Sequence, residues 1–240
     1  MGSFETEEMA RYWVDVIRND KDTIRNYVSN PALFNRLGTL KSGQDVLDCG
    51  CGEGYVSRWL TQKGHRLVGI DESKFILRAA KEAAVGNDEY IRGEAYQMPF
   101  RDESFDCVVS NFLLPELDNP ERFIKEVGRV LRPTGRFIFQ TLHPSLFISK
   151  TGQSEGRTVP DYFKTTKISE KLGRPYNLES PVEITTNHHP LSSYTHALTD
   201  NGFHIIYLDE PEPIESTPLD DPIREKLKDP RAILIDAIKI

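Results

Sequence analysis

The chain has 240 residues, of which 38% are hydrophobic and 28% charged, and its formal net charge is −7. This length can bury one enclosed core without disulfides, so we expect a single domain over residues 1–240. The acidic balance argues against nucleic acid as a partner, because phosphate contacts need clustered lysine and arginine. The N-terminal segment lacks the apolar run of a signal peptide or membrane span. We therefore expect a cytoplasmic protein without a membrane partner.

The elements predicted in the first part of the chain alternate between helices and strands. Residues 1–40 read as two helices, which we expect to form an N-terminal helical cap. Strands are predicted at Asp45–Cys49, His65–Ile70, Glu89–Gly93, Phe105–Ser110 and Arg136–Thr141, and helices at Tyr55–Lys63, Lys74–Ala84 and Pro120–Leu131. This alternation predicts βαβ units and a parallel sheet with helices on both faces.

The regular pattern fails after Thr141 and returns near the C-terminus. Residues 145–189 are rich in Ser, Thr, Gly, Pro and aromatic residues, and an insert of this length indicates a cover over the substrate site. A helix is predicted at Ser192–Asn201, a strand at Phe203–Leu208, and a last strand in "RAILIDAIKI". Two strands without a helix between them predict an antiparallel pair at the sheet edge.

The glycine-rich turn after the first strand is the strongest functional signal. Gly50, Gly52 and Gly54 follow Asp48, and Asp71 ends the second strand. A strand, a glycine turn and a helix allow the backbone to approach a ligand closely. The spacing is G-x-G-x-G, whereas a dinucleotide site has G-x-G-x-x-G. Asp48 would repel a pyrophosphate but suits the ammonium and sulfonium charges of S-adenosylmethionine (SAM), and Asp71 suits ribose hydroxyls.

Four blocks carry a resemblance to a known family. "VLDCGCGEG", "LVGIDES", "GEAYQMPFRDESFDCVVSN" and "LRPTGRFIF", in this order and spacing, resemble the class I SAM-dependent methyltransferases that act on small molecules. The resemblance covers about residues 40–142 and the terminal strands. It implies an α/β, Rossmann-like sheet of seven mostly parallel strands in the order 3-2-1-4-5-7-6, with strand 7 antiparallel, and SAM as cofactor.

The resemblance also implies a set of cofactor-binding positions. Asp48 and Gly50 correspond to positions beside the methionine moiety, and Asp71 to the ribose acid. Glu94 stands where the family more often has Asp near the adenine. The full set is Asp48, Gly50, Gly52, Gly54, Asp71, Glu72, Ser73, Glu94, Ala95 and Asn111. Residues 112–115 replace a histidine pair that many relatives carry, which predicts an apolar wall near the methyl group.

Catalytic and substrate residues are less strongly indicated. His143 follows the fifth strand, where it is the candidate general base, or alternatively caps the turn at Pro144. Candidate substrate contacts in the cap and the insert are Tyr12, Trp13, Tyr27, Phe147, Tyr162, His188 and His189; the alternative is that they pack in the core. Arg157, Lys164, Lys167 and Arg174 would suit a carboxylate-bearing substrate, or form a solvated surface. No metal site is expected.

We therefore expect a methyltransferase of the EC 2.1.1 type that acts on a small molecule, in specialised metabolism, as a monomer or homodimer. Two alternatives stay open, because the motifs bind the cofactor without setting the reaction. One is other SAM chemistry, such as intramolecular cyclisation of SAM, and the other is a non-catalytic SAM-binding module. An NAD-dependent dehydrogenase is disfavoured by Asp48 and the glycine spacing. The acceptor atom is not indicated.

Overall fold

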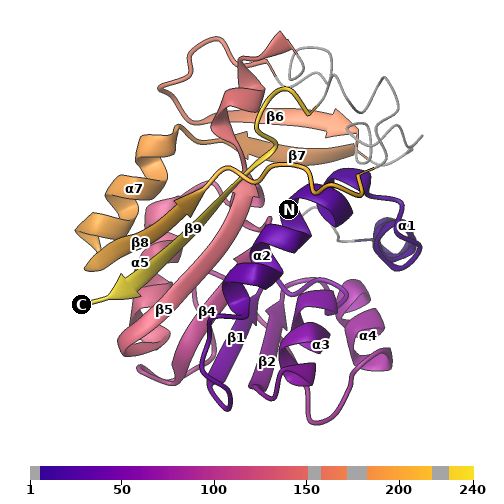
Figure 1. Cartoon of the computed structure of the whole chain (residues 1–240), viewed down its shortest axis with the longest axis vertical. Coiled ribbons are helices and arrows are strands. Elements are labelled where there is room, and N and C mark those ends of the chain that lie inside the picture. The colour runs from indigo at the N-terminus through magenta and orange to yellow at the C-terminus, as the bar shows by residue number, and fades with distance from the viewer. Residues whose placement is uncertain (1–5, 151–157, 172–182, 218–226) are drawn as a thin grey trace.

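The computed structural model describes residues 6–150, 158–171, 183–217 and 227–240. Figure 1 shows a central sheet with helices packed against it and a small hairpin beyond one end of its strands. The helices are α1 (Glu7–Arg18), η1 (Arg25–Ser29), α2 (Asn30–Leu37), α3 (Tyr55–Gln62), α4 (Lys74–Glu82), η2 (Leu114–Glu116), α5 (Pro120–Val130), η3 (Pro144–Phe147) and α7 (Leu191–Asp200). The strands are β1 (Asp45–Cys49), β2 (Arg66–Asp71), β3 (Glu89–Arg92), β4 (Phe105–Asn111), β5 (Leu131–Leu142), β6 (Thr166–Lys171), β7 (Glu183–His188), β8 (Phe203–Asp209) and β9 (Ala232–Lys239).

The main sheet has the order β3-β2-β1-β4-β5-β9-β8. Strands β1 to β5 pair in parallel, while β9 is antiparallel to both of its neighbours, β5 and β8. Because β6 and β7 form a separate sheet, β8 and β9 are the sixth and seventh strands of the main one. The predicted fold class, strand order and antiparallel last strand are therefore confirmed.

Local sequence explains where the helices begin. The Ser73 and Asn119 side chains cap α4 and α5 by accepting hydrogen bonds from the backbone N–H groups of Ile76 and Arg122. Pro120 occupies the first position of α5, where its missing N–H has no cost. These caps place both helices directly after the loops that follow strands β2 and β4.

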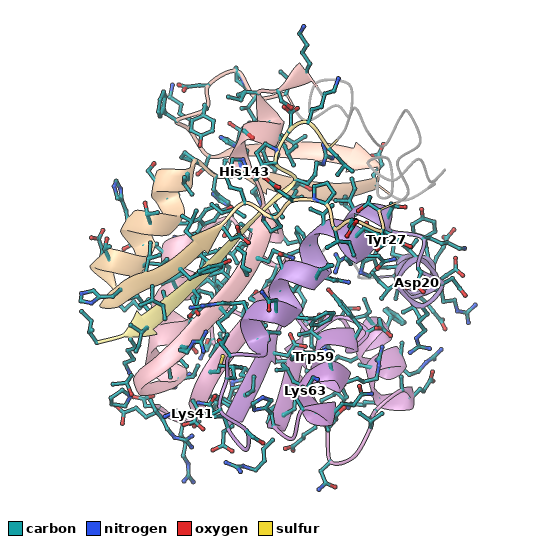
Figure 2. All side chains as sticks on the ribbon, in the orientation of Figure 1. Asp20, Tyr27, Lys41, Trp59, Lys63 and His143 are labelled. Carbon is teal, nitrogen blue, oxygen red and sulfur yellow. The ribbon has the colours of Figure 1, made fainter. Side chains whose placement is uncertain are left out.

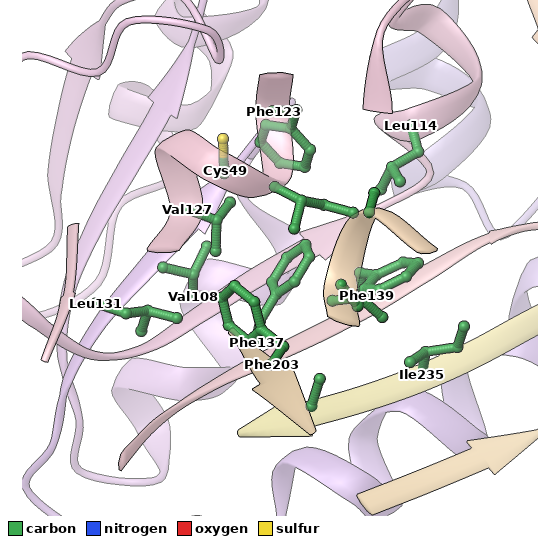
Figure 3. Close-up of a cluster of buried hydrophobic side chains, with 14 of the residues drawn as sticks. Cys49, Val108, Leu114, Phe123, Val127, Leu131, Phe137, Phe139, Phe203 and Ile235 are labelled. Carbon is green, nitrogen blue, oxygen red and sulfur yellow. The ribbon is translucent and has the colours of Figure 1, made fainter. Parts of the chain in front are cut away.

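The core lies on both faces of the sheet, as expected for parallel strands. One cluster packs α5 and α7 against β4, β5 and β9, and it contains stacked Phe137 and Phe139 with ring centroids 4.8 Å apart. Figure 3 shows part of this cluster. The second cluster packs Leu33 and Leu37 of α2 and Leu60 of α3 on the opposite face. The two clusters hold the strand ends rigidly, and those ends carry the predicted ligand residues.

Two regions differ from the sequence predictions. The segment Arg132–Gly135, which lies between the predicted helix and the predicted strand, belongs to β5, and the pairing of β4 with β5 is irregular there. The segment after residue 145, predicted as irregular, contains the antiparallel hairpin β6–β7, in which Lys167 pairs with Asn187. Of the insert residues considered as substrate contacts, Arg157 and Arg174 lie outside the described residues. No helix in the described part of the chain is long and apolar enough to cross a membrane.

Candidate cofactor and acceptor site

A cavity of about 610 Å³ lies at the carboxyl ends of the central strands. Its floor comes from the C-terminal ends of β1, β2 and β4, with Asp48, Asp71 and Asn111, and from the segment after β3, with Glu94. Strand order reverses between β1 and β4, and this reversal is where open α/β sheets bind ligands. Its roof comes from α1, η1 and the β6–β7 hairpin, which we call the cap–hairpin wall: Trp13, Ile17, Arg25, Thr165, Lys167, Ile184, Thr185, Thr186 and Asn187.

The glycine turn holds its shape through backbone bonds and left-handed residues. The N–H groups of Gly50 and Cys51 both donate to the carbonyl of Ile70, at 2.9 and 3.1 Å. Gly50 has φ +73°, and a Cβ there would lie 3.0 Å from Leu113 Cβ. Only glycine fits both constraints without strain. The backbone atoms of the turn, which carry no side chain at the glycines, therefore form part of the cavity wall.

Two carboxylates border this turn. Asp71 accepts hydrogen bonds from the N–H groups of Gly52 and Ser73, both at 3.0 Å. Asp48 is 1% exposed and accepts a 2.6 Å hydrogen bond from the Ser57 hydroxyl. Burial raises the pKa of Asp71 to about 6 and that of Asp48 to about 7, and for Asp48 the neighbouring Asp71 charge adds to the effect. A cation entering the cavity would be attracted to both.

Of the ten predicted cofactor positions, nine line the cavity: Asp48, Gly50, Gly52, Asp71, Glu72, Ser73, Glu94, Ala95 and Asn111. Gly54 is not among the described lining residues. It has φ +84° at the start of α3, and a Cβ there would lie 2.6 Å from the Tyr90 hydroxyl. The structure therefore gives Gly54 a packing role between α3 and β3.

Sequence reasoning missed Arg25, which belongs to the cap–hairpin wall. Its guanidinium lies 4.9 to 5.6 Å from the ring centroids of Trp13, Tyr55 and Phe112. Its Nε donates to Asp22 at 3.2 Å and its Nη1 to the Tyr55 hydroxyl at 3.0 Å. Arg25 is 7% exposed. The only sequence signal was an Asp three residues before an Arg, which also fits a surface pair.

A polar chain connects Arg25 to the floor of the cavity. The Tyr55 hydroxyl receives a hydrogen bond from the Asn111 amide and donates to Asn30 at 3.0 Å. Asn111 in turn accepts from Gln140 at 3.2 Å. The next residue, Phe112, has φ +59°, a strained conformation for a residue with a side chain. This bend directs the chain from the end of β4 into the predicted apolar wall at Leu113.

His143, the expected base, is not among the described lining residues, although its neighbour Leu142 is. Its Nε2 lies 2.8 Å from Glu210 and its Nδ1 lies 2.7 Å from the Ser145 hydroxyl. Burial lowers its pKa, which the Glu210 carboxylate partly offsets. Figure 2 labels His143 between the main sheet and the hairpin. Nothing in this arrangement supports a catalytic role for His143, and its contacts match the capping alternative.

Trp13 is the only one of the seven predicted substrate residues among the described lining residues. Tyr12, Tyr27, Phe147, Tyr162, His188 and His189 do not line the described cavity. Phe147 packs in a small core beside the hairpin. His188 Nε2 bonds the Tyr162 carbonyl and His189 Nε2 bonds that of Leu117, each at 2.8 Å. The two histidines therefore attach the hairpin to neighbouring segments.

Comparison with known proteins gives matches over part of the chain. Residues 47–139 match the family described as a methyltransferase domain. The chain is 36% identical over 101 residues to malonyl-[acyl-carrier protein] O-methyltransferase of Pectobacterium atrosepticum, a match that covers 42% of this chain and 40% of that protein. It is 35% identical over 159 residues to demethylmenaquinone methyltransferase of Lactococcus lactis, covering 60% of this chain and 63% of that protein.

The matched segment thus spans less than two thirds of either relative. The fold is shared with a SAM-dependent methyltransferase of Mesorhizobium loti at a TM-score of 0.69, with 23% identity and coverage of 87% of this chain and 96% of that one. The domain match begins in β1, includes the glycine turn and ends in β5. Residues 47–139 therefore match a methyltransferase domain, and the fold is that of SAM-dependent methyltransferases.

Proposed function

We propose that this protein transfers a methyl group from SAM to a small-molecule acceptor. The observation that carries the proposal is that Asp48, Gly50, Asp71 and Asn111 border one cavity at the strand-order reversal. The volume of about 610 Å³ is within the usual range for a small-molecule site, about 300–1,000 Å³. The part beside the cap–hairpin wall is where we place the second ligand.

The nucleoside end of SAM fits the Asp71 side of the cavity. The N–H groups of Gly52 and Ser73 hold the Asp71 carboxylate in one orientation, and its remaining acceptor capacity can bind ribose hydroxyls. Glu94, Ala95 and Tyr96 line the adjoining wall. This wall is where we place the adenine.

The methionyl end of SAM fits between Asp48 and Arg25. The Asp48 carboxylate attracts the cationic ammonium and sulfonium groups, while the Arg25 guanidinium suits the carboxylate. The hydrogen bonds from Arg25 to Asp22 and Tyr55 hold that guanidinium against the aromatic rings. Arg25 thus supplies a positive charge opposite the acidic floor.

Catalysis would depend on alignment and exclusion of water. When bound, SAM supplies an electrophilic methyl group on a sulfonium. Phe112 and Leu113 keep this part of the wall apolar, and the cap–hairpin wall covers it. Alignment and desolvation together can supply several kcal/mol, up to ~7–11 in ideal cases. No histidine occurs among the described lining residues, so the proposal assigns no histidine base.

The test is calorimetric titration with S-adenosylhomocysteine (SAH), methylthioadenosine and NAD. We expect SAH to bind and NAD not to bind. Asp71→Asn should weaken the binding of both SAH and methylthioadenosine by about tenfold or more, since both carry the ribose. Arg25→Lys should weaken the binding of SAH but not that of methylthioadenosine, because methylthioadenosine lacks the methionyl carboxylate. Arg11→Gln, in the exposed part of α1, is the control.

Turnover separates the proposal from its alternatives. Incubation with SAM and candidate acceptors should yield SAH and an acceptor heavier by one methylene. Formation of methylthioadenosine without acceptor would indicate cyclisation of SAM. Binding of SAH with no product from any acceptor would favour a SAM-binding module, and binding of NAD alone would overturn the proposed cofactor site.

A further inference from the structure

The charges around the cavity are divided between its two walls. All acidic residues of the described lining lie in the sheet-side segment, residues 48–118. The cap–hairpin wall contributes two cations, Arg25 and Lys167, and no acid. Arg25 already faces Asp22, Tyr55 and the methionyl end of the proposed SAM site. Lys167 is the second cation, and it belongs to a different element.

The hairpin register sets the direction of Lys167. Lys167 pairs with Asn187, and paired residues project from the same face of a two-stranded sheet. The Asn187 amide donates a 3.1 Å hydrogen bond to the carbonyl of Pro115, on the sheet side of the cavity. Thr185, two residues before Asn187, is on this face as well. The face that carries Lys167 therefore looks into the cavity.

Lys167 has no hydrogen bond or ion pair with any described residue, and the same holds for the Thr185 hydroxyl. Lys164, in contrast, lies outside the described lining and bonds Asp161 at 3.2 Å. Asp118, one of the acids on the sheet side of the cavity, accepts a 2.6 Å hydrogen bond from Tyr96. An acceptor that displaces water from the Lys167 ammonium removes part of its solvation, which costs free energy unless the acceptor supplies a negative charge in return. A neutral acceptor would leave that charge uncompensated.

We propose that the methyl acceptor is an amphipathic carboxylate whose anionic group pairs with Lys167 and whose apolar body lies against Ile17 and Leu142. Both residues line the cavity. The Thr185 hydroxyl supplies a second donor to the carboxylate. This inference rests on the proposed function, since it fills the part of the cavity that SAM leaves. It names the group that anchors the acceptor and leaves the reacting atom open.

The test measures binding to the full chain saturated with SAH. Calorimetry compares octanoate with octanamide, and 2-naphthoate with 2-naphthamide, so that each pair differs mainly in charge. At least one carboxylate should bind about tenfold or more tightly than its amide, as expected for a charge-assisted hydrogen bond. Lys167→Gln should remove this preference and Lys167→Arg should retain it. Lys164→Gln, in the same segment but paired with Asp161, should leave it unchanged.

Three results would overturn the inference while SAH still binds: equal affinity for acid and amide, a preference that survives in Lys167→Gln, or no binding of either carboxylate. Failure of SAH itself to bind would instead overturn the proposed function. The two failures are distinguished because SAH binding is measured first, in every variant.

Discussion

Arg18 Nε lies 2.9 Å from Glu53 Oε2, so helix α1 is joined to the glycine turn by an ion pair whose carboxylate is buried. Glu53 also accepts a 2.7 Å hydrogen bond from Arg58. The position of the cap over the cavity therefore depends on the same residue that sits between Gly52 and Gly54. This contact joins two segments that are 35 positions apart in the sequence.

We expect Arg18→Ala to lower the free energy of unfolding by about 1–2 kcal/mol, because Glu53 then keeps a single cation in a buried position. Urea denaturation measures the loss. Arg11→Ala on the same helix is the control, since Arg11 pairs with Glu7 at an exposed site and should change stability by less than about 0.5 kcal/mol. Equal effects of the two variants would show that the Arg18 contact does not hold α1.

Gly54 and Gly43 offer a matched test of close packing. Both have left-handed backbones, with φ +84° and +79°, but a Cβ at Gly43 meets nothing within 4 Å. Each Gly→Ala change costs about 1 kcal/mol of strain. Gly54→Ala should cost about 1–3 kcal/mol more, because its Cβ would collide with Tyr90. Thermal or urea unfolding of both variants measures the difference, and equal losses would contradict the packing role of Gly54.

Asp48 should make the stability of the cofactor-free protein depend on pH. Burial raises its pKa from 3.8 to about 7, so the folded state holds a proton that the unfolded state releases. The corresponding stabilisation is fully present below about pH 4 and is lost as pH rises through about 7. Asp48→Asn should remove this dependence. The free energy of unfolding of the variant, relative to that of the wild type, should therefore rise by about 2–4 kcal/mol between about pH 5 and pH 8.

Asp45 on the same strand is the control for Asp48. The Arg66 and Arg132 guanidinium groups hold the pKa of Asp45 below its usual value. The free energy of unfolding of Asp45→Asn, relative to that of the wild type, should therefore not rise as pH rises over the same range. Urea denaturation at both pH values gives the comparison. If the difference in stability between Asp48→Asn and the wild type did not vary with pH, the assigned protonation of Asp48 would be wrong.

Two substitutions at Phe112 distinguish the effect of backbone strain on stability from the effect of losing side-chain packing. Its φ of +59° costs a residue with a Cβ about 1–3 kcal/mol, a cost that glycine avoids. Phe112→Gly should therefore be more stable than Phe112→Ala by about 1 kcal/mol, although both lose the ring contact with Arg25. Both should impair turnover of any acceptor identified. If Phe112→Ala were more stable than Phe112→Gly, the backbone at residue 112 would leave the left-handed conformation once the phenylalanine ring is removed.

Much of the cofactor half of the site could be predicted from sequence because its determinants are local. The strand at Asp45–Cys49 was predicted with the bounds that the structure shows. Gly50 and Gly52 need left-handed φ values that follow from short-range sterics. The C-terminal strands were also predicted, and the placement of the last strand between β5 and β8 came from the family resemblance, not from the local pattern. The hairpin β6–β7 was missed because its strands carry mixed polar sequences without clear alternation.

The proposed acceptor half of the site depends on contacts between distant segments. His143 follows a correctly predicted strand, yet its ring is paired with Glu210, far along the chain. His188 and His189 bond to the backbone, because their ring nitrogens are buried where the hairpin meets the sheet side. Arg25 and Lys167 come from the cap and the hairpin and reach one cavity. Sequence by itself determined the sheet and the cofactor turn, since backbone geometry there depends on neighbouring residues. Only the tertiary structure decided which charges line the acceptor space, because burial and long-range pairing select them.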